Sequence, residues 1–203
     1  MIVPPAELPA PATASPGRAR RAPAKDLRGA IAPSAVDRLP VFLPSSRRTV
    51  SIPAYLRDEQ LWVGELPDAF RSVPNKVAYT HHGIPLYPEL LVVRLLEEAG
   101  WGAAWRKNWN VPAYWRDIGE EVEPSALAIT LLEQVSRQAG HDAPWDIVAW
   151  QDRQVRFLSS RTGHGQRLGA YLVNWLDTAL RMGVPLGCFA VVEHRHPRVP
   201  RRR

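Results

Sequence analysis

Helical spacing of apolar residues is clearest in residues 88–100. This segment begins with Pro88, which suits the first turn of a helix, and ends with Gly100, which suits its C-terminal end. Apolar side chains would cover more than half of the helix surface: Leu90, Leu91, Val92, Val93, Leu95, Leu96 and Ala99. Apolar residues at helical spacing and a terminal glycine also mark residues 124–140 and 165–183. The sequence therefore predicts three helices, the first of them largely buried.

Strand patterns lie between these helices. Residues 145–150 and 154–160 predict the two strands of a hairpin with a turn at 151–153. The continuous apolar run at 186–193 is typical of a buried parallel strand. We also expect a short strand at 100–105 and an aromatic-rich loop at 106–123. The final strand, helix and strand predict a right-handed crossover, so we expect an α/β fold with helices flanking a small mixed central sheet.

Composition divides the chain into four parts. The first 48 residues are rich in Pro, Ala and Arg, which favours extended chain without a core, so we expect a disordered leader over residues 1–48. Residues 49–82 hold more aromatic and aliphatic residues but are interrupted by prolines, which predicts an ordered lead-in made of short pieces. The folded domain is predicted at residues 83–193, and a basic tail at 194–203.

The distribution of charge bears on the partners. The chain has a net charge of +6, which favours an anionic partner such as nucleic acid. Residues 1–50 hold 8 basic and 3 acidic residues, and residues 194–203 hold 5 and none, which leaves 13 basic and 17 acidic residues between them. The basic character therefore belongs to the two ends of the chain rather than to the predicted domain.

Cysteine content and hydropathy bear on the location. The single cysteine, Cys188, excludes a disulfide framework or a cysteine-based zinc site within the chain, and it suits a reducing compartment. No stretch approaches the ~20 apolar residues of a membrane span, and the N-terminus lacks the apolar segment of a secretion signal. We therefore predict a cytoplasmic protein without a membrane partner.

Two acidic residues stand where predicted elements begin: Glu89 in the first turn of the first helix and Asp146 ahead of the hairpin. With these acids, the segments PLYPELLVVRLLEEAGW, NW (108–109), WDIVAW, VRF, WLDTALRMGVPL and FAVVE resemble the PD-(D/E)XK nuclease superfamily. Within it, the chain is similar to small proteins with a virus-type replication-repair nuclease (VRR-NUC) domain. The resemblance spans about residues 83–193 and implies a restriction-endonuclease-like core.

The resemblance also implies a metal site. In this superfamily a helix acid, a hairpin acid and the acid of an acid-x-Lys triplet hold Mg²⁺ or Mn²⁺, which activates water. The implied catalytic positions here are Glu89, Asp146, Ser159 and Arg161, and only Glu89 and Asp146 are metal ligands. Ser159 offers a neutral hydroxyl in place of the triplet acid, and Arg161 stays protonated in place of the lysine. Leu172 stands where the family carries a glutamine. Because two carboxylates without the third acid leave most of the coordination shell to water, the ion is expected to bind weakly.

Structural roles compete with these assignments. An acid such as Glu89 also favours the helix dipole, Asp146 could simply end a loop, and the Ser-Ser-Arg segment could be an exposed strand end. Glu97, eight residues after Glu89, is the nearest replacement for the missing acid. A pair such as His81 and His82 is more often solvated than metal-bound. Packing is favoured over base stacking for a group of tryptophans, Trp101, Trp105, Trp109 and Trp115.

Three functions follow from these observations. The first is a VRR-NUC-like nuclease-fold protein, catalytically weak or inactive, that binds nucleic acid, DNA rather than RNA, or a protein partner. The second is an active Mg²⁺-dependent DNA endonuclease, a phosphodiester hydrolase, with a rearranged site. The third is a protein–protein interaction module, which the acidic middle of the chain favours. In the first two, Glu89 and Asp146 should flank one cleft beside the sheet.

Overall fold

A computed structural model describes residues 26–72, 76–107, 113–142, 145–163 and 167–196. Its centre is an eight-stranded sheet in the order β1-β2-β10-β9-β8-β5-β6-β7. The strands are β1 (Ala35–Leu43), β2 (Arg48–Asp58), β5 (Gly102–Lys107), β6 (Ala113–Asp117), β7 (Glu120–Glu121), β8 (Ile147–Gln151), β9 (Gln154–Thr162) and β10 (Phe189–Arg195). β10 pairs in parallel with both β2 and β9, whereas the other neighbours are antiparallel, so the sheet is mixed.

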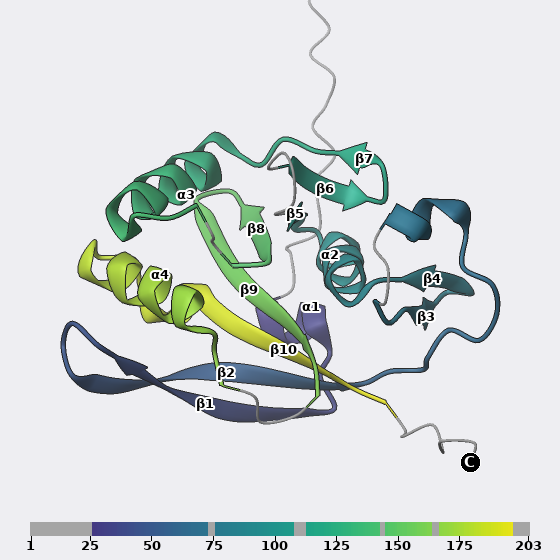
Figure 1. Cartoon of the computed structure of the whole chain (residues 1–203), viewed down its shortest axis with the longest axis horizontal. Coiled ribbons are helices and arrows are strands. Elements are labelled where there is room, and N and C mark those ends of the chain that lie inside the picture. The colour runs from purple at the N-terminus through teal and green to yellow at the C-terminus, as the bar shows by residue number, and fades with distance from the viewer. Residues whose placement is uncertain (1–25, 73–75, 108–112, 143–144, 164–166, 197–203) are drawn as a thin grey trace, which may run out of the picture.

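Helices cover both faces of this sheet (Figure 1). The helices are α1 (Leu27–Ile31), α2 (Pro88–Glu98), α3 (Ala126–Ala139) and α4 (Ala170–Arg181), with short 3₁₀ turns η1 (Asp68–Ser72) and η2 (Leu186–Cys188). α1, α2 and the separate hairpin of β3 (Tyr79–His81) and β4 (Ile84–Leu86) pack on one face, and α3 and α4 pack on the other. The α/β class predicted from the sequence, a mixed sheet flanked by helices, is confirmed.

Local chemistry explains where the predicted helices begin and end. α2 starts at Pro88, whose missing N–H is not needed in the first turn. At α3 the hydroxyl of Ser125 accepts a hydrogen bond from the Ala128 amide (3.3 Å), and Gly140 ends the helix with φ +73°. α4 begins at Ala170, five residues later than the start of the predicted segment. All three predicted helices are therefore present.

The hairpin and the crossover are also confirmed. β8 and β9 pair in antiparallel register around a turn at Asp152, and β9, α4 and β10 form a parallel strand–helix–strand unit. The last strand starts at Phe189, after η2, and continues through His194 and Arg195. The predicted basic tail from residue 194 is therefore wrong for its first two residues, because the sheet extends over them. Residues 197–203 lie outside the described residues.

The predicted boundary of the leader at residue 48 is wrong. α1 and β1 lie within it, and β1 pairs along its whole length with β2. Few apolar side chains serve this segment, but they are well placed: Leu27, Ile31, Val41 and Leu43 are buried. Elements from elsewhere in the chain help to bury them, α2 beside α1 and α4 beside β1, which composition does not reveal. Residues 1–25, the rest of the predicted leader, lie outside the described residues.

Two other segments are more ordered than predicted. The expected lead-in contains β2, an 11-residue strand that includes Pro53. Pro53 lies opposite Arg38 of β1, and pairing with β10 starts only at Ala54, so the residue needs no hydrogen bond to β10. The aromatic-rich loop expected at 106–123 contains β6 and β7 instead. Trp115 of β6 is buried edge-on against Trp105, and this packing fixes β6 beside β5.

Candidate functional site

The first acid of the predicted site, Glu89, is paired with a lysine. Glu89 lies in the first turn of α2 and is 9% exposed. The Lys76 Nζ atom lies 2.7 Å from Glu89 Oε2. The ammonium of Lys76 also sits 4.5 Å from the centre of the Trp105 ring and 5.4 Å from that of Tyr87. Aromatic faces stabilise a cation, so Lys76 is held over Glu89 by both kinds of contact.

The second acid, Asp146, is held by the start of the predicted triplet. The Ser159 hydroxyl donates a 2.8 Å hydrogen bond to Asp146 Oδ2, and the Ser160 amide donates a 3.0 Å bond to the same oxygen. β8 and β9 are antiparallel, and Ile147 faces Leu158, which brings Asp146 beside Ser159. The hairpin therefore places Asp146 and Ser159 together.

The two acids interact electrostatically. Burial raises the pKa of Glu89, the Lys76 ammonium opposes this rise, and the negative charge of Asp146 adds to it. Burial likewise raises the pKa of Asp146, against the hydrogen bond from Ser159 and the charge of Lys76. Glu89, Asp146 and Lys76 thus form one charge cluster, close to the first residues of α2 and β8.

Arg161 interacts electrostatically with Asp146 and with a second acid, Glu193. Burial lowers the pKa of the Arg161 guanidinium, and the negative charges of Glu193 and Asp146 oppose that change. Arg161 and Glu193 are paired in register on β9 and β10, and Glu193 is 2% exposed. Residues two apart on a strand share a face, so Ser159 and Arg161 point to the same side of the sheet. The cluster therefore continues across β9 to a buried acid on β10.

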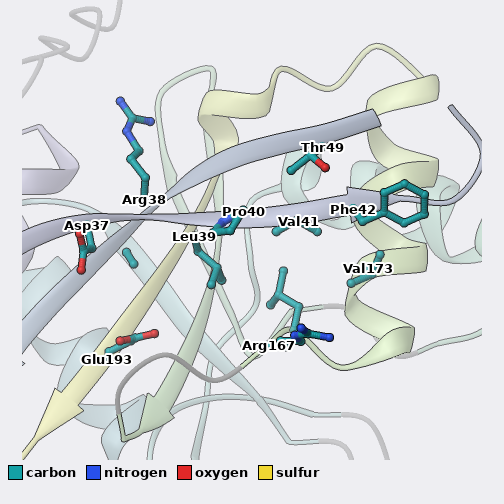
Figure 2. Close-up of a pocket in the computed structure, with 12 residues that line it drawn as sticks. Asp37, Arg38, Leu39, Pro40, Val41, Phe42, Thr49, Arg167, Val173 and Glu193 are labelled. Carbon is teal, nitrogen blue, oxygen red and sulfur yellow. The ribbon is translucent and has the colours of Figure 1, made fainter. Parts of the chain in front are cut away.

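A groove opens beside Glu193. It has a volume of about 660 Å³ and lies between the β1–β2 hairpin, β10 and the start of α4. Figure 2 shows Asp37 and Glu193 on one side of it and Arg167 at the α4 end, whereas the Arg38 side chain points away from the groove. Apolar residues of β1 and α4 complete the wall, among them Val41, Phe42 and Val173. The groove thus offers both acidic and basic groups next to the cluster.

The remaining sequence candidates have structural positions. Leu172 is buried in the core between α4 and the sheet. Glu97 binds Arg116 (2.7 Å) and Arg94 (3.3 Å) near the other end of α2, so its carboxylate is engaged away from Glu89. Trp101, Trp105 and Trp115 are buried, as expected for packing, and Trp109 lies outside the described residues.

A buried polar network lies on the α2 side of the same strands. His194 is fully buried, and its Nε2 atom lies 3.0 Å from the Ser160 hydroxyl. Its Nδ1 atom lies 3.6 Å from Glu59, and the Tyr79 ring stacks on it at 5.3 Å. Burial lowers the pKa of His194 and raises that of Tyr79 to about 12. His194 and Tyr79 thus pack together on the α2 side of β9 and β10.

The site fits a divalent cation poorly. Mg²⁺ and Mn²⁺ need several oxygen ligands with negative charge. Of the two acids that could supply them, Glu89 is paired with Lys76, and Asp146 accepts bonds from Ser159 and Ser160. An ammonium and a hydroxyl thus occupy positions next to the carboxylates where a cation would bind.

Sequence reasoning missed Lys76 and Glu193. Lys76 follows a proline-interrupted stretch in which no periodic pattern marks it, and only the fold brings it to α2. Glu193 did carry a signal, because it directly follows a continuous apolar run, and an acid in such a strand is rarely buried without a partner. The two residues supply a positive and a negative charge that the motif alone does not contain.

Comparisons with protein-family models, with curated proteins and with solved structures found no match. Among the helices of the described residues, none has both the length and the apolar character needed to cross a membrane.

Proposed function

We propose that the chain is a nuclease-fold protein of the VRR-NUC type that binds nucleic acid, DNA rather than RNA, and cleaves it weakly or not at all. The observation that carries this proposal is the pairing of Lys76 with Glu89 at 2.7 Å. In a metal-dependent nuclease the carboxylates are neutralised by the divalent ion, which also activates water. Here an ammonium of the protein itself neutralises them, so the drive to bind an ion is reduced.

Ser159 supports the same conclusion. Ser159 is 2% exposed, and its hydroxyl donates a hydrogen bond to Asp146. A neutral side chain therefore stands on β9 at the position where the third carboxylate would lie. Two carboxylates without a third leave most of the coordination shell to water, and we propose weak binding of Mg²⁺ or Mn²⁺ by Glu89 and Asp146.

Contact with nucleic acid is supported by the arginines on this side of the molecule. Arg161 lies beside Asp146, and Arg167 lines the groove, while Arg38 extends from the outer side of β1 (Figure 2). Guanidinium groups bind phosphate well because their fork of donors matches two phosphate oxygens.

A cytoplasmic location, suggested by the single Cys188, is part of the proposal.

Two observations favour other functions. The cluster holds two carboxylates and an ammonium, which are the charge types of an intact PD-(D/E)XK site, so Lys76 could replace the missing triplet lysine in an active endonuclease. Phe42 is 58% exposed at the groove, and an exposed aromatic ring of this kind favours binding of a protein partner.

The decisive change is Lys76→Met, which removes the ammonium and keeps the length of the side chain. We expect the wild type to bind DNA in a salt-dependent way and to leave supercoiled and single-stranded DNA uncut with Mg²⁺ or Mn²⁺. In Lys76→Met the two carboxylates lose their counter-charge, so Mg²⁺ should raise its melting temperature more than that of the wild type.

Arg153→Met is the matched control, since it removes an exposed positive charge in the β8–β9 turn. Nicking by the wild type that is lost in Lys76→Met and kept in Arg153→Met would establish the active endonuclease instead. Absence of binding to DNA and RNA at low salt would leave the protein-interaction function as the better one.

A further inference from the structure

Two histidines and a glutamate meet at the far end of α2. His81 Nε2 lies 2.9 Å from Glu98 Oε1, and His82 Nε2 lies 3.5 Å from the same oxygen. The two imidazole rings are 4.1 Å apart between centroids. One ligand atom from each of the three residues lies within 4.8 Å of the other two. The three side chains thus converge on one small volume.

The hairpin turn is what points both histidines to one place. His81 ends β3, and His82 and Gly83 form the two-residue loop to β4. Both loop residues have positive φ, +46° at His82 and +79° at Gly83. This conformation is uncommon for a residue other than glycine, although histidine adopts it more readily than most. Glu98, in the last turn of α2, completes the group from a different element.

The spacing of the donors suits a transition metal. Two ligands at 2.0–2.1 Å from a tetrahedral ion lie about 3.4 Å apart, close to the separation between Glu98 and His82. Imidazole nitrogens with a single carboxylate select Zn²⁺ and its neighbours rather than Mg²⁺, which prefers oxygen. Three protein ligands also leave a coordination position for water or a further ligand.

We propose that His81, His82 and Glu98 form a binding site for Zn²⁺ or a similar divalent transition metal. The site is distinct from the Glu89–Asp146 cluster, because nine residues of helix, roughly 14 Å, separate Glu98 from Glu89. A bound ion fastens the β3–β4 hairpin to the C-terminal end of α2. The segment that carries Lys76 leads directly into this hairpin, so the metal restrains the same part of the chain.

The test uses the full chain without an affinity tag, titrated with ZnCl₂ alone. We expect a single equivalent of Zn²⁺ to bind by calorimetry and to raise the melting temperature, because an ion that binds only the folded state stabilises it. His82→Gly should weaken binding by about tenfold or more. Glycine keeps the positive φ of the turn, and His82 is an exposed side chain, so this variant should fold.

Three further variants locate the site. Glu98→Gln removes the carboxylate and should lose binding, whereas His141→Asn, at the end of α3, and Asp146→Asn should keep it. Equal Zn²⁺ affinity in the wild type, His82→Gly and Glu98→Gln would overturn the proposal, as would binding that disappears in His141→Asn or Asp146→Asn. The readouts are Zn²⁺ affinity and melting temperature, not DNA binding or nicking, so the result is independent of the proposed function.

Discussion

Lys76 is the residue on which the candidate site depends most. It pairs with Glu89 over the rings of Trp105 and Tyr87, and its charge opposes the burial that raises the pKa of both acids. A buried carboxylate costs stability unless its charge is compensated. The site therefore keeps its acids at some expense of stability, which is a common feature of functional sites.

A prediction at this scale concerns Asp146→Asn. The folded-state pKa of Asp146 is raised, so the folded protein holds the proton more strongly than the unfolded chain does. The contribution of the carboxyl group to stability is then fully present below its ordinary pKa of 3.8 and is lost as the pH rises through the folded value. Asparagine keeps the acceptor for Ser159 without this loss, so the melting temperature should rise by a few degrees at neutral pH.

Thermal melts between pH 4 and pH 8 test this expectation. The difference between Asp146→Asn and the wild type should shrink as the pH falls. Asp152→Asn is the control, because Asp152 is exposed in the β8–β9 turn and asparagine tolerates its positive φ of +49°. A lower melting temperature for Asp146→Asn at neutral pH would mean that Lys76 and Arg161 require the charge of Asp146.

At the scale of elements, β5 and β8 fit together through a glycine. Gly102 of β5 faces Trp150 of β8 in register. A Cβ atom at Gly102 would lie 2.3 Å from Trp150 Nε1, which is far inside van der Waals contact. The indole ring covers the strand backbone at this point, so the absence of a side chain at Gly102 allows β8, and with it Asp146, to lie close to β5.

Gly102→Ala should therefore destabilise the fold by about 1–3 kcal/mol, the usual cost of forcing extra volume into a packed contact. The free energy of unfolding in urea measures this loss. Gly187→Ala is the matched control, since nothing lies within 4 Å of a Cβ atom there, and its stability should stay close to that of the wild type. Equal stabilities of the two variants would show that Trp150 moves aside without cost.

At the scale of the whole molecule, residues 26–58 belong to the folded domain. β1 and β2 extend the sheet beyond β10, and the helix α1 packs against α2. They also form one wall of the groove beside Glu193. A fold whose order began only at the predicted lead-in, at residue 49, would lose this wall and leave β2 with an unpaired edge.

A chain that starts at residue 49 should fail to fold as the full chain does. It lacks four buried aliphatic side chains, Leu27, Ile31, Val41 and Leu43, each of which contributes about 1.5–3 kcal/mol on burial. Their sum is comparable to the roughly 5–15 kcal/mol by which a domain is stable. Circular dichroism and thermal melting of both chains would measure the loss. A cooperative transition at the same temperature in the shorter chain would contradict the expectation.

The sequence by itself determined the elements whose signal is local. Residues 88–100, 124–140 and 165–183 carry helical periodicity with proline, serine or glycine at their ends, and the β8–β9 hairpin is contiguous in the chain. The hairpin also brought Asp146 beside Ser159, because antiparallel strands joined by a short turn have a fixed register. The β9–α4–β10 crossover followed from the order of the elements.

Only the tertiary structure decided the rest. The pairing of β2 with β10 joins residues more than a hundred positions apart, and no local pattern specifies such a partner. No local pattern specified the contact of Lys76 with Glu89 either. Nor did one specify the contacts of Glu193 with Arg161 or of Glu98 with the two histidines. Periodicity reports which face of an element is buried, but not which distant side chains share that burial. Charges brought together in this way define the chemistry of the site.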